Sequence, residues 1–247
     1  MLDRNPDVRH AAARAVGTEA PENQDDHPER GVEPMEADLP TLLRFLNAGG
    51  DNGRRAAAGL LQLCEKSDFE GTGLIAAERV PGPWRKKCAT AEFELPEAAV
   101  RSPDVLIRRV AMEAAASTGA RASSLLGALM DATESMDAWV RSNTIEALGN
   151  IGPAAAPAVP RLIGLLDGDQ RSNAARSLGA IGAAAISAVP RLLDIVRNPE
   201  EHTGERVEAL NSLLKIAPEE ADVQKALHEA AEDKDDLLRA MAVERLR

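Results

Sequence analysis

The chain has 247 residues, a hydrophobic share of 44% and an aromatic share of 2%, with three Phe, two Trp and no Tyr. Aromatic side chains supply much of the buried area in compact cores, so this core must be built from Ala, Leu, Val and Ile. Ala and Leu are strong helix formers, which favours closely packed helices. The net charge of −11 and the pI near 5.0 weigh against a nucleic-acid partner, because phosphate binding draws on Lys and Arg.

The pattern of the N-terminal residues predicts one helix pair, and an acidic insertion separates its two helices. Residues 8–17 carry apolar side chains at helical spacing, and residues 39–46 supply the expected partner helix. Between them, residues 18–38 hold eight acidic side chains against one Arg, and prolines interrupt the same stretch. We expect this insertion to be a solvated loop.

A second interrupted unit follows, with its first helix predicted at residues 54–64 and a degenerate second helix at residues 95–100. Residues 67–92 form an irregular insertion between them, and this insertion contains the densest basic segment, Trp84, Arg85, Lys86 and Lys87. Trp and Arg are enriched in binding hot spots, so this segment is a candidate recognition element. The two cysteines, Cys64 and Cys88, form no CxxC pair, and we expect free thiols in a reducing compartment.

The central part of the chain repeats itself at a fixed interval. Residues 140–152 and 170–182 share the pattern Arg-Ser-Asn, then Leu-Gly-x-Ile-Gly, in the same register. The apolar positions fall on one face of a helix, and Gly152 and Gly182 stand where a helix end favours positive φ. Ala-Val-Pro-Arg-Leu then opens a second helix in each unit, with Pro160 or Pro190 in its first turn. Each unit is thus predicted to be a helix, a tight turn and an antiparallel helix.

Weaker copies of this unit extend in both directions along the chain. We predict helix pairs at residues 107–119 with 125–130 and at 206–217 with 223–230, and a last helix without a partner at 238–246. One such pair cannot bury enough apolar surface alone, so neighbouring pairs must stack on a continuous core.

The pattern Asp-x-x-Val-Arg-x-x-Ala-x-x-Ala-Leu-Gly-x-Ile-Gly, followed by Ala-Val-Pro-x-Leu-x-x-Leu-Leu, resembles the HEAT-like repeats of the phycobilisome-lyase type, most closely between residues 104 and 197. The resemblance implies an all-α fold, a right-handed α-solenoid of about six helix pairs whose second helices line the concave side. We accordingly expect N-terminal repeats over residues 1–66, the irregular insertion at 67–92, and a regular array over 93–247 that ends in the unpaired helix.

Two regular polar features are expected to be structural. Asp–Arg pairs recur at four-residue spacing, and we expect each Asp to cap a helix and each Arg to pair with that Asp or with the next repeat; the pairs are Asp104/Arg108, Asp137/Arg141, Asp167/Arg171 and Asp235/Arg239. The Gly pairs 149/152 and 179/182 follow helices rather than strands, so they are predicted to be turns and not phosphate loops.

The sequence predicts no catalytic, cofactor or metal site, because its four histidines are scattered. Deoxyhypusine hydroxylase, which resembles this scaffold, holds di-iron with several His-Glu pairs, whereas only His228-Glu229 occurs here. Bilin lyases share the repeat type, so an accessory subunit of a bilin-lyase-like enzyme is the alternative. HEAT-like DNA glycosylases suggest nucleic-acid binding as a third hypothesis, but residues 97–247 have 17 basic and 23 acidic side chains, a net charge of −6.

We therefore expect a non-enzymatic scaffold that binds a protein or peptide on its concave surface. The second helices should place Arg44, Arg161, Arg191 and Arg197 on that surface, and the segment at residues 84–87 is a separate candidate recognition element. No window approaches about 18 consecutive apolar residues, so we expect no membrane contact and a cytoplasmic protein. The last helix is expected to leave an apolar face uncovered, which suggests either that the chain is a fragment of a longer array or that it forms a homodimer end to end.

Overall fold

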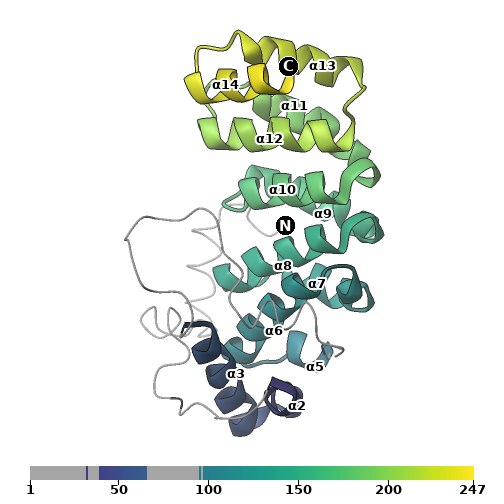
Figure 1. The fold of residues 1–247 in the computed structure, drawn as a ribbon. Helices are drawn as coiled ribbons and strands as arrows, with labels where there is room; N and C mark the ends of the chain where they lie inside the picture. Colours follow the sequence, from purple (N-terminus) through teal and green to yellow (C-terminus); the bar gives the residue numbers. More distant parts are fainter. Residues whose placement is uncertain (1–31, 33–38, 66–94, 96) are drawn as a thin grey trace, which may run out of the picture.

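The computed structural model describes Val32, residues 39–65, Leu95 and residues 97–247, and every regular element in those ranges is helical. Figure 1 shows these helices stacked in a column, from α2 and α3 at one end to α13 and α14 at the other. The prediction of an all-α solenoid is therefore confirmed. The predicted helix at 8–17, most of the acidic insertion and the insertion at 67–92 lie outside the described residues.

The helices form two layers that run along the column. The first helices of the units stack in one layer, and the second helices stack beside them in the other. The first layer contains α3 (Gly50–Glu65), α6 (Val105–Thr118), α8 (Ala138–Ile151), α10 (Arg171–Ile181), α12 (Thr203–Ile216) and α14 (Asp236–Arg245). The second layer contains α2 (Leu39–Ala48), α5 (Glu97–Val100), α7 (Leu126–Ala132), α9 (Val159–Gly164) with η3 (Leu165–Asp167), α11 (Val189–Arg197) and α13 (Ala221–Ala231).

The connection inside a central unit is longer than the tight turn that the sequence suggested. It is a seven-residue 3-10 segment in each case: η1 (Gly119–Leu125), η2 (Gly152–Ala158) and η4 (Gly182–Ala188). The glycine that opens each segment has a φ of 58°, 74° or 72°, which confirms the positive φ predicted for Gly152 and Gly182. Pro160 and Pro190 lie in the first turn of α9 and α11, where a missing N–H leaves no helical bond unmade.

Gly149 and Gly179 lie inside helices rather than in turns, so their prediction as turn residues is wrong. A Cβ built on Gly149 would lie 2.8 Å from Ser177 Oγ and 2.9 Å from Ser177 Cα. A Cβ on Gly179 would meet Ser212 in α12 at 2.8 Å and 2.9 Å from the same two atoms. Glycine at these positions therefore allows α8, α10 and α12 to approach each other closely.

The core consists of small and aliphatic residues, as the composition predicted. In α8 and α10 the buried side chains include Ile145, Leu148, Ala174 and Leu178, all at 0% exposure, and they belong to one continuous cluster with the second helices. Neighbouring units thus share a single elongated interior rather than separate cores.

The segment Arg171–Arg197 is, by length and composition alone, apolar enough to cross a membrane. It consists of α10, η4 and α11, and half of its most apolar window is buried. Neither α10 with 11 residues nor α11 with nine approaches the roughly 20 residues that a spanning helix needs. The apolar residues of this segment instead belong to the shared core of the array.

Candidate interaction surface

Charged side chains follow the second helices from one unit to the next. Arg161 of α9 donates to Met130 O at 2.5 Å and lies 3.2 Å from Glu134, both at the end of the preceding unit. Arg191 of α11 occupies the equivalent place one unit later and contacts Asp167 and, at 3.9 Å, Asp194. We call the following residues the second-helix charge row: Glu134, Arg161, Asp167, Arg191, Asp194, Arg197 and Glu229.

The row links neighbouring units instead of presenting a strip of cations. Arg197, at the end of α11, donates from Nε to Glu229 of α13 at 3.1 Å. With the contacts of Arg161 and Arg191, each of the three arginines of the row therefore has an acidic partner in a neighbouring unit. The hydrogen bond and charge of Asp167 raise the pKa of Arg191 above its usual value. The surface therefore carries both signs of charge in alternation, with the arginines half-buried or exposed.

The other predicted surface residues do not join this row within the described part of the chain. Arg44 of α2 is exposed, and its guanidinium carbon lies 5.2 Å from the centre of the Phe45 ring. Trp84, Arg85, Lys86 and Lys87 lie outside the described residues.

The arginines of the first helices connect each unit to its neighbour. Arg141 Nη1 donates to Ser135 O at 2.8 Å, and its Nη2 donates to Asp169 at 2.8 Å. Arg171 donates from Nε to Leu166 O at 2.6 Å and from Nη1 to Glu205 of α12 at 2.9 Å. Of the two partners that the sequence suggested, pairing with the next repeat is the one observed for these side chains.

Two of the capping aspartates use one carboxylate oxygen for the cap and the other for an arginine of the preceding repeat. Asp137 Oδ1 accepts from Val140 N at 2.8 Å, while Oδ2 accepts from Arg109 Nη2 at 2.6 Å. Asp104 divides its oxygens in the same way, since Oδ1 accepts from Leu106 N at 3.0 Å and Oδ2 accepts from Arg54 Nη1 at 2.5 Å. Each of these carboxylates thus orients its own helix and ties it to the previous one.

Asp167 is the exception, and its prediction as a helix cap is wrong. The 3-10 segment η3 extends the second helix to Asp167, and α10 begins only at Arg171. Gln170 takes the N-cap position without a side-chain capping bond, and Asp167 pairs with Arg191 instead.

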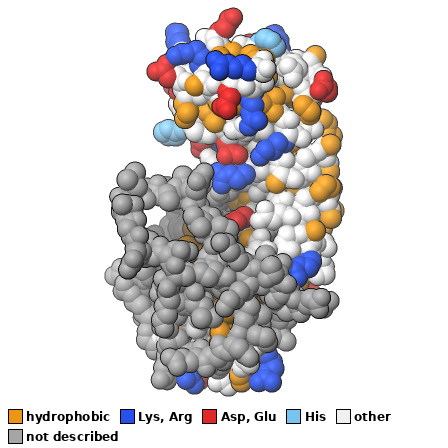
Figure 2. Space-filling view, in the orientation of Figure 1, with side chains coloured by type: hydrophobic (Ala, Val, Ile, Leu, Met, Phe, Trp, Pro, Cys, Tyr) orange, Lys and Arg blue, Asp and Glu red, His pale blue; other side chains and the backbone are white. Residues whose placement is uncertain are grey.

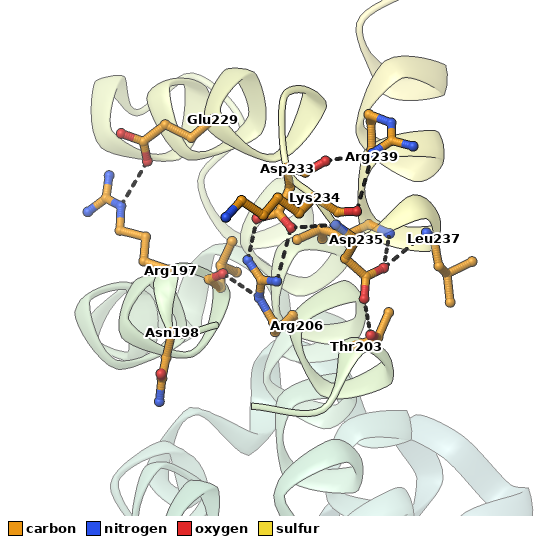
Figure 3. Close-up of polar contacts among 12 residues, drawn as sticks. Arg197, Asn198, Thr203, Arg206, Glu229, Asp233, Lys234, Asp235, Leu237 and Arg239 are labelled. Atoms are coloured by element: carbon orange, nitrogen blue, oxygen red, sulfur yellow. Dashed lines mark hydrogen bonds and ion pairs between the residues drawn. The ribbon is translucent and has the colours of Figure 1, made fainter. Parts of the chain in front are cut away.

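A denser polar network joins the C-terminal helices, as Figure 3 shows. Arg206 of α12 is 6% exposed; its Nε donates to Val196 O at 2.9 Å and its Nη2 donates to Asp233 at 2.6 Å. The hydrogen bond from Arg206 holds the pKa of Asp233 below its ordinary value. Arg239 of α14 donates to Asp233 O at 2.7 Å, so one short turn receives arginines from two helices.

Asp235 completes this network at the start of α14. One of its oxygens accepts from Leu237 N and Leu238 N at 3.0 and 3.1 Å, and the other accepts the hydroxyl proton of Thr203 in α12. Thr203 thus donates to the second oxygen of Asp235, as Arg54 does for Asp104 and Arg109 does for Asp137. In Figure 3, Leu237 points away from the polar network.

Sequence reasoning did not single out the exposed apolar side chains near the unit junctions. Met136, which directly precedes the capping Asp137, is 58% exposed, and Trp139 in the first turn of α8 is 43% exposed. Ile186 in η4 is also exposed. Figure 2 likewise shows hydrophobic side chains along one edge of the column. Apolar periodicity assigns such residues to the core, so only the packing of the neighbouring unit reveals their exposure.

In the described part of the chain the charged groups form pairs and small networks that are spread along the array. Among the residues that the structure describes, no group of three or more His, Cys, Asp or Glu side chains is placed to hold a metal ion. His202 and His228 are exposed, and His228 Nδ1 lies 2.8 Å from Gln224 O of its own helix. The arrangement suits repeated polar contacts over a long surface.

Comparison with known proteins agrees with this architecture. Residues 94–172 match the family model for HEAT repeats. The matched segment includes α6, α8 and α9, which carry the cap-and-arginine pattern described above. No curated protein matches the chain.

Among solved structures, the chain is similar to the crystal structure of an engineered protein determined as a target of the Northeast Structural Genomics Consortium. The sequence identity is 19% and the TM-score is 0.59, over 85% of this chain and 95% of the engineered one. At that identity the similarity shows a shared fold, and it extends well beyond the HEAT-repeat segment.

Proposed function

We propose that this protein is a non-enzymatic scaffold that binds a protein or peptide on the concave surface formed by its second helices. The observation that carries the proposal is the second-helix charge row, which repeats with the units along a continuous helical array. Stacked repeats favour extended binding surfaces, because each unit adds one more equivalent contact position.

The half-exposed pairs of the row can exchange partners at low cost. Surface ion pairs contribute only about 0–1 kcal/mol, so an incoming carboxylate can replace Glu134 or Asp167 beside its arginine with little loss. Neighbouring helices stack at about 8–10 Å, which sets the approximate spacing between Arg161 and Arg191. A polyproline II segment has three residues per turn and rises about 3.1 Å per residue, so acidic residues at every third position lie on one face about 9 Å apart, which fits this spacing.

Two further features support a binding role rather than catalysis. Titratable side chains in the described residues are spread along the array in pairs, whereas general acid–base chemistry needs groups that converge on one substrate. The match to the family model for HEAT repeats over residues 94–172 is consistent with a scaffold. We also propose that the protein has no nucleic-acid partner, on the basis of the net charge of −11, and that it is cytoplasmic, because its two cysteines form no CxxC pair and are expected to be free thiols in a reducing compartment.

Affinity capture from the source cells, followed by mass spectrometry, tests the proposal. The wild-type chain should capture a reproducible protein, and the double variant Arg161→Glu/Arg191→Glu should lose most of it. The matched control is Arg176→Glu/Lys215→Glu, which makes the same change of charge on the exposed side of α10 and α12. Circular dichroism must show equal helicity for all three proteins.

Equal capture by wild type and by the Arg161/Arg191 variant would contradict binding through the charge row. Loss of capture in both variants would assign binding to overall charge rather than to this surface. The phycobilisome-lyase subtype has its own test: a bilin added to the protein should shift its absorbance if the chain is an accessory subunit of such an enzyme, and the scaffold proposal predicts an unchanged spectrum.

A further inference from the structure

Arg161 and Arg191 occupy equivalent places in neighbouring units, but their guanidinium groups are used to different extents. Arg191 donates from Nε and Nη2 to Asp167, and its Nη1 lies 3.9 Å from Asp194 Oδ2. Arg161 makes its contacts through Nη1, which donates to Met130 O at 2.5 Å. Within the described residues, Nε and Nη2 of Arg161 make no hydrogen bond. Arg161 therefore keeps two adjacent N–H donors for a ligand.

The repeat register shows a second difference between the two arginines. Both second helices open with Ala-Val-Pro-Arg-Leu, so Arg161 aligns with Arg191, and Gly164 aligns with Asp194. Asp194 follows Arg191 by three residues and places a second carboxylate near it. In α9 that place is open, because a Cβ built on Gly164 would have no neighbour within 4 Å. The unit that contains Arg161 thus lacks an acid that the next unit supplies.

The glycine at position 164 is not required by the structure of α9 itself. Its φ of −62° and ψ of −27° are helical values that other residues also adopt. Gly149 and Gly179, by contrast, allow the close packing of first helices. Gly164 is exposed, and glycine is among the weakest helix formers, so most other residues would stabilise α9 better. Its effect is to leave the backbone of α9 accessible next to Arg161.

Arg161 is held in place by its own unit junction. Met130 O accepts from Arg161 Nη1 and also from Thr133 Oγ1, at 2.7 Å, and Thr133 is 2% exposed. Glu134 lies 3.2 Å from the same Nη1, and 35% of the Arg161 side chain remains exposed. A guanidinium that is oriented through one nitrogen loses little conformational freedom when its other edge binds a ligand.

We propose that Arg161 binds a carboxylate side chain of the partner through Nε and Nη2, and that Gly164 allows the partner's main chain to approach beside it. These two N–H groups match the two oxygens of a carboxylate. Glu134 can stay at Nη1 while the ligand binds. The inference rests on the proposed function and identifies the arginine that anchors the ligand. Arg191 contributes less, because each of its three nitrogens already faces an acidic side chain.

A fluorescent synthetic peptide of repeated Glu-Pro-Pro triplets is the probe, since its prolines favour the polyproline II conformation. Fluorescence anisotropy at low salt should show binding to the wild-type protein. Arg161→Gln should weaken binding by about tenfold, and Arg191→Gln by about threefold or less. Gly164→Asp supplies the missing acid and should also weaken binding by about tenfold. The matched control Gly204→Asp makes the same change at an exposed position of α12, where an added Cβ has no neighbour within 4 Å, and should bind like the wild type.

A spectroscopic measurement on the unaltered chain separates direct contact from an effect on folding. The arginine Nε–H resonance of Arg161 should shift when the peptide is added to wild-type protein, and that of Arg191 should shift less. A wild-type protein that does not bind the peptide overturns the inference. So does a Gly164→Asp variant that binds as well as the wild type, or an Arg191→Gln variant that loses as much affinity as Arg161→Gln.

Failure of the inference and failure of the proposed function give different results. Capture of a cellular partner that survives Arg161→Glu/Arg191→Glu contradicts binding through the second-helix charge row. Capture that is lost in the double variant, and is lost equally in each single variant, supports the row but contradicts the leading role of Arg161.

Discussion

Replacing Gly149 with alanine should destabilise the protein, although alanine is the better helix former. Gly149 lies inside α8, where it faces Ser177 of α10. An added Cβ would lie 2.8 Å from Ser177 Oγ, 2.9 Å from its Cα and 2.9 Å from its Cβ. Because one of these atoms belongs to the backbone, a change of rotamer at Ser177 cannot relieve the overlap, and the two helices must move apart.

The expected magnitude follows from two opposing effects. Overpacking of a close-packed core typically costs about 1–3 kcal/mol, while the change from Gly to Ala inside a helix favours folding by about 1 kcal/mol. Because the overlap includes a backbone atom, we expect the packing cost to lie in the upper part of its range, so the net loss in the free energy of unfolding should reach up to about 2 kcal/mol. Gly127→Ala is the matched control, because its Cβ would have no neighbour within 4 Å in α7. That variant should be as stable as the wild type or gain up to about 1 kcal/mol.

Urea denaturation followed by circular dichroism compares the two variants directly. The midpoint should fall for Gly149→Ala and should stay or rise for Gly127→Ala. Adding Ser177→Gly to the first variant should recover only part of the loss, because the overlap with the backbone of residue 177 remains and the bond from Ser177 Oγ to Ile145 O disappears. A Gly149→Ala protein as stable as the Gly127→Ala protein would refute the close stacking of α8 on α10.

Two further predictions concern the polar links between units. Asp137→Ala should lower the free energy of unfolding by roughly 2–4 kcal/mol in thermal or urea melts, since it removes a helix cap and the ion pair with the partly buried Arg109; Asp137→Asn, which keeps a capping oxygen, should lose less. Stability should also fall in acid. The hydrogen bond from Arg206 lowers the pKa of Asp233 in the folded protein below its ordinary value of 3.8. The ionised Asp233 therefore contributes fully to the free energy of unfolding above pH 3.8, and this contribution is lost as the pH drops through the folded pKa. Urea midpoints measured from pH 6 down to about pH 3 should decline, and less steeply in Asp233→Asn; identical slopes would contradict this role of Asp233.

The sequence was sufficient to predict the fold because each element depends on local patterns. Apolar spacing defined the helices, and Gly152 and Gly182 marked the ends of α8 and α10 through their positive φ. Asp104 and Asp137 directly precede their helices, and their capping role was predictable from that position alone.

Features that depend on how the units stack could not be predicted with the same success. Asp167 resembles the other capping residues in spacing, but η3 displaces the start of α10 and redirects its carboxylate to Arg191. Gly149 looked like a turn residue because its packing partner Ser177 is remote in the sequence. The candidate surface is a further example: Arg161, Arg191 and Arg197 were expected on one surface, but their pairing was not predictable because their acidic partners lie about one unit away.

The measurement that tests the shared core most directly is amide hydrogen exchange of a Gly179→Ala variant. Gly179 of α10 packs against Ser212 of α12, and the two helices belong to one buried cluster. If neighbouring units are stabilised through one interior, exchange should accelerate in both α10 and α12, by similar factors, relative to the wild type. Faster exchange in α10 alone, with α12 unchanged, would show that the units are stabilised separately and would contradict the account.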